Sequence, residues 1–226
     1  MDFLLQPGGQ IRGTARVPGD KSISHRSIML GAIADGVTTV DGFLEGEDAL
    51  STLNAFRAMG VEIEGPENGR VRIHGVGRDG LKAPLGDVYV GNSGTSMRLL
   101  AGLLAGQKFD VTMTGDVSLS KRPMERVAKP LREMGAVVET AEGGRPPLTL
   151  RGGQSLKAID YVLPMASAQV KSCVLLAGLY AEGETRTTEP APTRDHSERM
   201  LRGFGYDVEV DGPVAKLQGG GRLTAV

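Results

Sequence analysis

The sequence of 226 residues lacks most features that mark secreted, membrane and nucleic-acid-binding proteins. Its single cysteine, Cys173, excludes an internal disulfide and a metal-binding cysteine cluster, and it fits a reducing compartment. The formal net charge is -1, so no overall basic field attracts nucleic acid or an anionic membrane. The opening Met1–Pro7 lacks the basic region of a secretory signal, and no apolar run reaches the roughly 20 residues of a membrane span. We therefore expect a soluble, cytoplasmic protein without nucleic-acid or membrane partners, in which any affinity for anions is local.

The sequence does contain an internal repeat. Three times, a turn of small or hydroxyl-bearing residues with at least one cation runs into an almost wholly apolar stretch. These turns and stretches are Gly19–Arg26 with Ser27–Gly36, Gly91–Arg98 with Leu99–Gly106, and Ala166–Lys171 with Ser172–Gly183. Each copy closes on Met-Gly or Phe-Gly, and these closing pairs lie roughly 70 to 75 residues apart. The pattern favours one large core built from one unit used three times.

Each copy is predicted to contain a strand, a buried helix, a second strand, a second helix and two further strands. In the first copy these ranges are 14–17, 24–33, 38–40, 48–59, 61–64 and 71–74. In the second copy they are 88–90, 95–104, 110–113, 122–134, 136–139 and 148–150. In the third copy they are 161–163, 169–179, 184–188, 195–204, 207–210 and 214–217.

The first helix of each copy is apolar on nearly all sides, which is typical of a buried helix. Ile28–Ile33 and Leu99–Leu104 leave almost no polar face. The second helix differs, because Arg126, Lys129 and Arg132 alternate with apolar residues and place one side at solvent. We therefore predict an α/β fold of the α+β kind, with three buried helices about a pseudo-threefold axis and the sheets outside.

This arrangement has an electrostatic consequence. A helix amino end carries roughly half a positive charge and several unpaired backbone N–H groups, so three such ends pointing the same way attract an anion. Gly91–Gly94 suits close backbone approach to a phosphate or carboxylate. Cations gather at the same turns or at the starts of the second helices: Lys21, Arg26, Arg98, Arg122, Lys171 and Arg194. We interpret this set as a cleft for a ligand with several negative groups.

Taken singly, each of these residues also fits an ordinary structural role. Hydroxyls at helix starts often act only as N-caps, a role open to Ser22, Ser24, Thr95 and Ser167. Lys121–Pro123 fits a solvated loop before a helix with proline in its first turn. Gln169 is less common as a cap, which favours a ligand contact. His25 and His196 are predicted to be supporting polar residues and Cys173 a core residue, and His74 has no predicted function.

Five segments together closely resemble the 5-enolpyruvylshikimate-3-phosphate synthase family: Gly19–Arg26, Gly91–Arg98, Lys121–Met124, Met165–Ser172 and Thr193–His196. The resemblance implies an inside-out α/β domain of three βαβαββ repeats, with buried parallel helices and outer sheets. It also implies transfer of the enolpyruvyl group of phosphoenolpyruvate to the 5-hydroxyl of shikimate 3-phosphate, with release of phosphate, in the shikimate pathway of aromatic amino acid biosynthesis. Neither a metal nor an organic cofactor is implied.

Matching positions in the family imply roles for individual residues. Lys21 is expected to touch both substrates and to act in catalysis. The shikimate 3-phosphate contacts are expected at Ser22, Arg26, Ser167, Gln169 and Arg194, and the phosphoenolpyruvate contacts at Asn92, Gly94, Thr95 and Arg122. Gly94 matches the glycine that discriminates the inhibitor glyphosate. Ala168, Arg194 and His196 depart from the commonest pattern and resemble a second subclass.

The resemblance also predicts domain boundaries. The family enzyme has two similar domains of three repeats each, and this chain contains three repeats, at about 14–77, 87–153 and 158–221, in a substrate-binding domain over 14–221. Residues 1–13 are expected to belong to the second, C-terminal domain, and 222–226 to begin the return to it. That domain, in cis or in trans, is expected to supply the principal carboxylate, so this fragment alone is predicted to be inactive.

Two other functions remain open from the sequence. A UDP-N-acetylglucosamine enolpyruvyl transferase shares the architecture and the donor, but it carries a cysteine in a mobile loop, whereas Cys173 is predicted in a helix. A noncatalytic anion-binding domain, or an RNA-end-processing relative with a similar repeat, belongs to another class. Neutral net charge and few aromatic residues disfavour nucleic acid.

Overall fold

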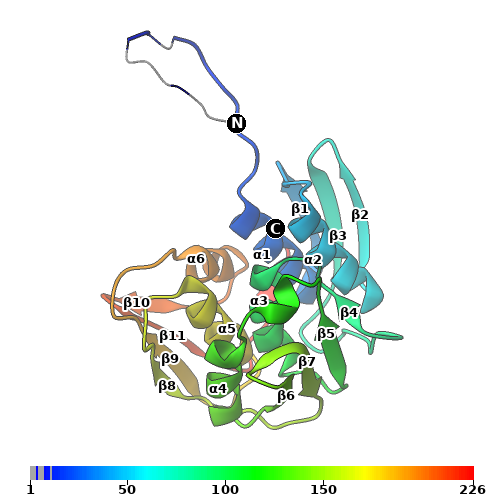
Figure 1. Cartoon of the computed structure of the whole chain (residues 1–226), viewed down its shortest axis with the longest axis vertical. Helices are drawn as coiled ribbons and strands as arrows, with labels where there is room; N and C mark the ends of the chain where they lie inside the picture. The colour runs from blue at the N-terminus through cyan, green and yellow to red at the C-terminus, as the bar shows by residue number, and fades with distance from the viewer. Residues whose placement is uncertain (1–3, 5–7, 11) are drawn as a thin grey trace.

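The computed structural model describes residues 4, 8–10 and 12–226. Three four-stranded sheets surround a centre of helices (Figure 1). The first copy of the repeat contains α1 (Lys21–Ile33), β1 (Ala34–Asp41), α2 (Glu47–Ala58), β2 (Glu62–Glu67) and β3 (Arg70–Val76). The second contains β4 (Val88–Tyr89), α3 (Gly94–Leu104), β5 (Val111–Thr114), the short 3-10 helix η1 (Leu119–Lys121), α4 (Glu125–Glu133), β6 (Val137–Ala141) and β7 (Arg145–Arg151). The third contains β8 (Asp160–Val162), α5 (Ala168–Gly178), β9 (Glu184–Thr188), α6 (His196–Gly203), β10 (Glu209–Asp211) and β11 (Val214–Gln218), and β12 (Leu223–Thr224) follows it.

The second and third sheets share one strand order. In each, the strand before the buried helix pairs in parallel with the strand after it, so β4 pairs with β5 and β8 with β9. The second strand of the copy then pairs antiparallel with the last one, β5 with β7 and β9 with β11. The predicted repeat is therefore confirmed at the level of strand pairing.

The first sheet is completed by the other end of the chain. Its order is β12-β1-β3-β2, and β12 pairs in parallel with β1 through Ala34 opposite Leu223 and Asp35 opposite Thr224. The prediction of a strand over 14–17 is wrong, because residues 12–20 form no strand and lead away from the body (Figure 1). β1 accepts only one neighbour on that edge, and β12 occupies the place.

This pairing bears on the predicted domain boundaries. Residues 222–226, expected to begin a return to a second domain, include β12 and so contribute to the first sheet. The assignment of residues 1–13 to that second domain falls partly outside the described residues. The two assignments remain predictions.

Two predicted helix starts need correction. Helix α1 begins at Lys21 rather than at residue 24, which places Lys21 and Ser22 in its first turn. Helix α4 begins at Glu125 rather than at 122, and Arg122 has extended backbone angles, φ -84 and ψ 135. The cause is Pro123, because a residue before proline is disfavoured in the helical region.

The core lies between the helices and the inner faces of the sheets. Residues 24–33 of α1 are all buried, as are 96–104 of α3 and 170–178 of α5. Helices α3 and α5 pack so closely that a Cβ on Gly102 would lie 2.1 Å from the backbone oxygen of Cys173. The prediction of helices inside and sheets outside is confirmed. Within the described part of the chain, no helix has the length and apolarity needed to cross a membrane.

Candidate functional site

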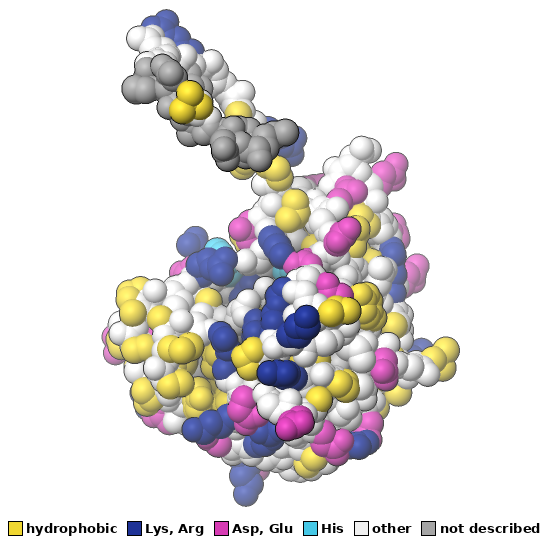
Figure 2. All heavy atoms as spheres, in the orientation of Figure 1, with side chains coloured by type: hydrophobic (Ala, Val, Ile, Leu, Met, Phe, Trp, Pro, Cys, Tyr) yellow, Lys and Arg dark blue, Asp and Glu magenta, His cyan; other side chains and the backbone are white. Residues whose placement is uncertain are grey.

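The amino ends of α1, α3 and α5 meet around one hollow. Gln169 Nε2, in the first turn of α5, donates to Thr95 Oγ1 in the first turn of α3 at 3.0 Å. Arg26 Nη2, from α1, donates to Ser172 Oγ of α5 at 2.8 Å. The hollow between these ends is lined by Ser22, Arg26, Thr95, Ala168, Gln169, Arg194 and His196. Lysine and arginine side chains gather near the middle of this face (Figure 2).

Each of the three helices has its own N-cap. The caps are Asp20, Ser93 and Ser167, and each side chain accepts a hydrogen bond from a backbone N–H in the first turn. The capping role that the sequence left open is therefore filled by Ser167 but not by Ser22, Ser24 or Thr95. Ser24 Oγ donates to the Asp20 carbonyl oxygen at 2.9 Å, and Ser22 and Thr95 line the hollow.

Lys21 and Ser22 occupy the first turn of α1. The Lys21 ammonium forms an ion pair with Asp48 in the first turn of α2, and its side chain remains 51% exposed. Ser22 Oγ accepts a hydrogen bond from Arg194 Nη1 at 3.1 Å, which brings the loop before α6 to the start of α1. Asp48 was not among the residues singled out from the sequence, although its place in the first turn of an expected helix was visible.

Arg26 is 5% exposed and joins three helices. Its guanidinium donates to Ser197 Oγ of α6 at 2.7 Å, to Ser172 Oγ of α5 at 2.8 Å and to the Ser22 carbonyl oxygen at 3.0 Å. Burial lowers the pKa of Arg26 to about 10, although the negative charge of Glu198 opposes this shift. Arg26 therefore stays charged at neutral pH, and all the acceptors it binds are uncharged.

The turn before α3 is held by Arg122. Its Nη2 donates to Asn92 Oδ1 and to Ser118 Oγ, and its Nη1 donates to the Asn92 carbonyl oxygen at 3.3 Å. Asn92 Nδ2 donates in turn to Asp116 Oδ2 at 2.7 Å. Hydrogen bonds from the backbone N–H of Leu119 and from Asn92 lower the pKa of Asp116. Asp116, a residue that the sequence did not single out, thus fixes the amide that holds Arg122.

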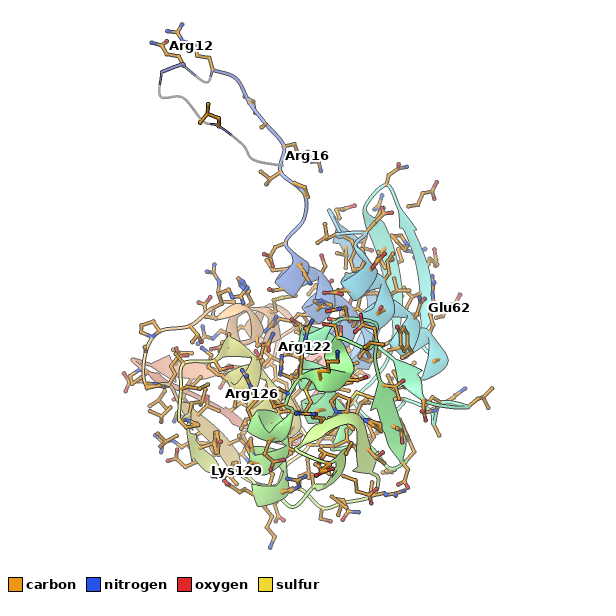
Figure 3. The ribbon with its side chains drawn as sticks, viewed as in Figure 1. Arg12, Arg16, Glu62, Arg122, Arg126 and Lys129 are labelled. Carbon is orange, nitrogen blue, oxygen red and sulfur yellow. The ribbon has the colours of Figure 1, made fainter. Side chains whose placement is uncertain are left out.

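Gly94 lies between two guanidinium groups at the start of α3. A Cβ on this residue would lie 2.8 Å from Arg98 Nη1 and 3.3 Å from Arg122 Nη1. Arg98 Nη1 donates to Gln169 Oε1 at 2.9 Å. Burial lowers the pKa of Arg98, and the positive charges of Arg126 and Arg122 lower it further. Figure 3 shows Arg122 and Arg126 on the same side of the molecule, over α3 and α4. The missing side chain at Gly94 therefore lets two guanidinium groups come close to the start of α3.

Lys171 does not belong to the cleft, and its inclusion in the predicted cation set is wrong. It is the fourth residue of α5 and is 3% exposed. Its ammonium lies 2.7 Å from Glu198 Oε1 and 3.1 Å from Glu189 Oε2. A side chain one turn beyond the cap points into the protein, where a buried ammonium requires countercharges.

A chain of buried hydroxyls supports the starts of α1 and α3. His25 Nδ1 lies 2.8 Å from Thr52 Oγ1 of α2, which lies 2.7 Å from Ser96 Oγ of α3. Ser96 Oγ donates to the cap Ser93 at 2.7 Å. Burial, assisted by the charge of Lys21, lowers the pKa of His25 to about 4. As predicted, His25 is a supporting polar residue, and it is neutral at pH 7.

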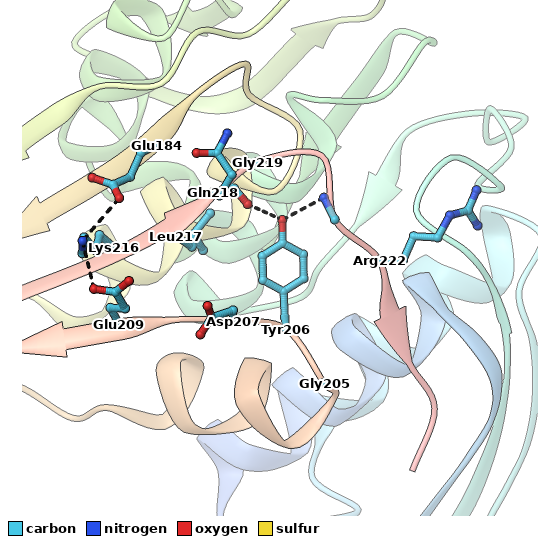
Figure 4. A pocket seen from close by; sticks show the side chains of 11 residues that line it. Glu184, Gly205, Tyr206, Asp207, Glu209, Lys216, Leu217, Gln218, Gly219 and Arg222 are labelled. Atoms are coloured by element: carbon cyan, nitrogen blue, oxygen red, sulfur yellow. Dashed lines mark hydrogen bonds and ion pairs between the residues drawn. The ribbon is translucent and has the colours of Figure 1, made fainter.

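One further hollow and one group of potential metal ligands lie on the outer sheets. A hollow of about 460 Å³ beside β11 is lined by Tyr206, Lys216 and Arg222 among others (Figure 4). There the Tyr206 hydroxyl donates to the Gln218 carbonyl oxygen and accepts from the Gly221 N–H. These two hydrogen bonds hold the turn between β11 and β12. Among the described residues, Glu62, Glu64 and His74 form the one group of three potential metal ligands, but Arg72 already binds Glu64.

Comparisons with known proteins give one consistent result. The family model described as EPSP synthase (3-phosphoshikimate 1-carboxyvinyltransferase) matches residues 5–226. A 3-phosphoshikimate 1-carboxyvinyltransferase of Alkalilimnicola ehrlichii is 66% identical over 99% of this chain and 50% of its own length. One of Methylococcus capsulatus is 66% identical over 99% of this chain and 51% of its own. A solved structure of EPSP synthase from Acinetobacter baumannii matches with a TM-score of 0.93 and 69% identity, over 94% of this chain and 48% of that one. The chain thus spans about half the length of the relatives it matches.

Proposed function

The chain belongs to the EPSP synthase family, and we propose that it forms the half of a 3-phosphoshikimate 1-carboxyvinyltransferase that holds shikimate 3-phosphate and part of phosphoenolpyruvate. One observation carries the proposal: residues from the first turns of the three capped helices line one hollow together with Arg26 and Arg194. A ligand with a phosphate and hydroxyls matches such a hollow, because helix amino ends and guanidinium groups both favour anions.

The two substrates divide the site between them. Shikimate 3-phosphate contacts the α1 and α5 side, at Ser22, Arg26, Ser167, Gln169 and Arg194. Phosphoenolpyruvate lies at the start of α3, at Asn92, Gly94, Thr95 and Arg122. Lys21, the first residue of α1, contacts both ligands, and the inhibitor glyphosate competes with phosphoenolpyruvate near Gly94. Because the acceptors held by Arg26 and Arg122 are neutral, the charges of both guanidinium groups remain available to the ligands.

The residues of this chain fit the chemistry of the transfer. A proton added to the methylene carbon of phosphoenolpyruvate leaves a cationic carbon, which the 5-hydroxyl of shikimate 3-phosphate attacks as it gives up its proton. The tetrahedral intermediate then loses the proton from its methyl group together with phosphate, and the enolpyruvyl ether remains. No protein nucleophile is needed, so these residues orient the ligands and compensate two phosphates and a carboxylate. Lys21, held by Asp48, takes part in the proton transfers.

The remaining catalytic groups come from outside this chain. A C-terminal domain, joined in cis or supplied in trans, closes over the hollow in the cytoplasm and contributes the principal carboxylate. The chain alone binds shikimate 3-phosphate weakly and does not turn over. The match spans only about half the length of the related enzymes, which supports a division of the active site between two domains.

The cysteine-dependent alternative has little support. Cys173 is fully buried in α5, and burial raises the pKa of its thiol. A UDP-N-acetylglucosamine enolpyruvyl transferase requires that cysteine in a mobile loop instead.

Calorimetry on the 226-residue chain tests the binding proposal. We expect heat of binding with shikimate 3-phosphate and none with UDP-N-acetylglucosamine or RNA. Replacement of Arg194 by alanine should weaken that binding. Binding of RNA or of the UDP-sugar in preference to shikimate 3-phosphate would refute the assignment.

Kinetics on the chain joined to a complete C-terminal half test the donor site. Arg122→Ala should weaken phosphoenolpyruvate binding by about 2–5 kcal/mol, seen as a raised KM, while folding is little changed. Arg151→Ala is the matched control, because Arg151 is exposed on β7 and binds Glu139 and Asp110. Unchanged phosphoenolpyruvate kinetics in Arg122→Ala would contradict the placement.

A further inference from the structure

Lys171 is a buried lysine that the proposed reaction leaves without a role. Its ammonium is surrounded by two carboxylates, Glu198 Oε1 at 2.7 Å and Glu189 Oε2 at 3.1 Å. The side chains of all three residues are at most 10% exposed. A buried charge with good partners binds its neighbours tightly, because the alternative is an unpaired ion in a poorly hydrated place. Lys171 therefore fixes the two segments that carry these glutamates.

The two glutamates flank the loop that carries Arg194. Glu189 follows β9 and accepts hydrogen bonds from the Thr193 backbone N–H at 3.2 Å and from Thr193 Oγ1 at 2.5 Å. Glu198 lies in the first turn of α6, directly after the loop. One ammonium on α5 thus ties both ends of the segment 189–198 to the amino end of that helix.

Arg194 projects from this segment toward the hollow. Its Nη1 donates to Ser22 Oγ, while residues 192–194 face residues 166–169 across a concavity of about 470 Å³. Arg194 itself is exposed and makes no ion pair among the described residues. Apart from the hydrogen bond to Ser22, its position depends on the backbone that carries it, and Lys171 binds a glutamate at each end of that backbone segment.

We propose that Lys171 is a positioning residue for anion binding: through Glu189 and Glu198 it holds the 189–198 segment against α5 and so keeps Arg194 at the hollow. The identity of the anion, shikimate 3-phosphate, rests on the proposed function, whereas the attachment of the loop does not. Burial raises the pKa of Glu189, but the hydrogen bonds from Thr193 and Lys171 together outweigh it and leave the pKa lowered, which keeps the carboxylate charged at neutral pH.

Amide hydrogen exchange tests the attachment without any ligand. In Lys171→Met, exchange at 190–195 should accelerate by roughly tenfold or more, because Glu189 loses its ion pair with α5, while Ser197 at the other end of the segment still donates to Ser172 Oγ at 2.7 Å. Lys171→Arg should restore most of the protection. The control is Lys216→Met, since Lys216 also contacts two glutamates, Glu184 and Glu209, on the outer third sheet (Figure 4).

Unchanged exchange at 190–195 in folded Lys171→Met would overturn the proposal. If that variant does not fold, Glu189→Gln replaces it, because this change keeps the Lys171–Glu198 pair, removes the charge that binds Lys171 and leaves one amide oxygen to accept from Thr193. Faster exchange confined to 190–195 in Glu189→Gln supports the proposal, and unchanged exchange there overturns it.

A double-mutant cycle then tests the consequence for binding. Calorimetry with shikimate 3-phosphate should show about tenfold weaker binding for Lys171→Met than for wild type. In an Arg194→Ala background the same change should have almost no effect, because Lys171 acts through Arg194. Independent, additive losses would overturn the positioning role. Absence of binding by the wild-type chain would instead refute the proposed ligand, and the exchange experiment would still decide the attachment.

Discussion

Lys171 at the helix ends and Lys216 on the outer sheet differ mainly in their surroundings. Each ammonium contacts two glutamates, at 2.7 and 3.1 Å for Lys171 and at 2.9 and 3.4 Å for Lys216. The Lys171 side chain is 4% exposed and the Lys216 side chain 28%. Water screens the outer pairs, which makes them weak, whereas the inner trio has no such compensation if one member is lost. The same pattern of one lysine and two glutamates therefore stabilises the fold strongly at the helix ends and contributes little to stability on the outer sheet.

Arginines show a second difference between these regions. On the outer second sheet, Arg151 binds the carboxylates of Glu139 and Asp110, which cancel its charge. At the helix ends, Arg26 and Arg98 bind hydroxyls, an amide oxygen and backbone carbonyls. Neutral acceptors fix a guanidinium without cancelling its charge, so the inner region keeps positive charge for a ligand.

The largest expected effect is on the inner trio. Lys171→Met should lower the free energy of unfolding by about 3–5 kcal/mol, because it leaves two buried carboxylates without their partner. Urea denaturation of both proteins measures the difference. A loss as small as that of an exposed pair would remove the distinction between the two regions.

His25 provides a pH test of the inner region. Its pKa falls from 6.5 in an unfolded chain to about 4 in the fold. The unfolded chain therefore binds more protons between these values, so stability is full above pH 6.5 and falls by up to about 3 kcal/mol as the pH drops toward 4. Unfolding of His25→Asn should depend less on pH in this window. The control is His196→Asn, because His196 lies at the half-buried start of α6. If the free energy of unfolding of His25→Asn changed with pH as steeply as that of wild type, the lowered pKa of His25 would be contradicted.

Close packing of α3 on α5 gives a third, smaller contrast. Gly102→Ala places a methyl group 2.1 Å from the Cys173 carbonyl oxygen and should cost about 1–3 kcal/mol. Gly203→Ala, at the exposed end of α6, meets no atom within 4 Å and should be neutral or slightly stabilising. Thermal unfolding of the pair checks this, and similar midpoints would mean that the helices separate easily.

Lys216→Met should have the smallest effect. Exposed ion pairs contribute about 0–1 kcal/mol, so the free energy of unfolding should change by less than about 1 kcal/mol. High salt should reduce even this difference, because ions screen exposed charges. A loss comparable to that in Lys171→Met would show that burial does not separate the two lysines.

Local patterns allowed most elements to be predicted. The apolar stretches gave α3 and α5 to within one residue at each end, and β9 occupies its predicted range of 184–188. The strand over 14–17 failed because pairing is not local: β12, from the far end of the chain, occupies that edge of β1. The start of α4 was misplaced at Arg122, although Pro123 was a visible signal of extended backbone.

The prediction that Lys171 belongs to the cleft was wrong for the same reason. The motifs supplied the cations and the helix starts, and Ser22, Thr95, Gln169 and Arg194 do meet at one hollow. Nothing local separated Arg26, which lines that hollow, from Lys171, which is neutralised beneath it. The partners Asp48 and Asp116 were missed because an isolated acidic residue at a helix start or in a loop resembles any other.

Hydrophobic periodicity and repeated turns were enough to dictate three buried helices, their outer sheets and a supply of positive charge at the helix starts. The tertiary structure then decided which cations are paired with carboxylates and which remain available to a ligand. It also decided which strand completes the first sheet. Both outcomes depend on groups far apart in the chain. A carboxylate can pair with a cation only after packing has brought the two together. In the same way, a strand can bond the free backbone groups of a sheet edge only once it lies beside that edge.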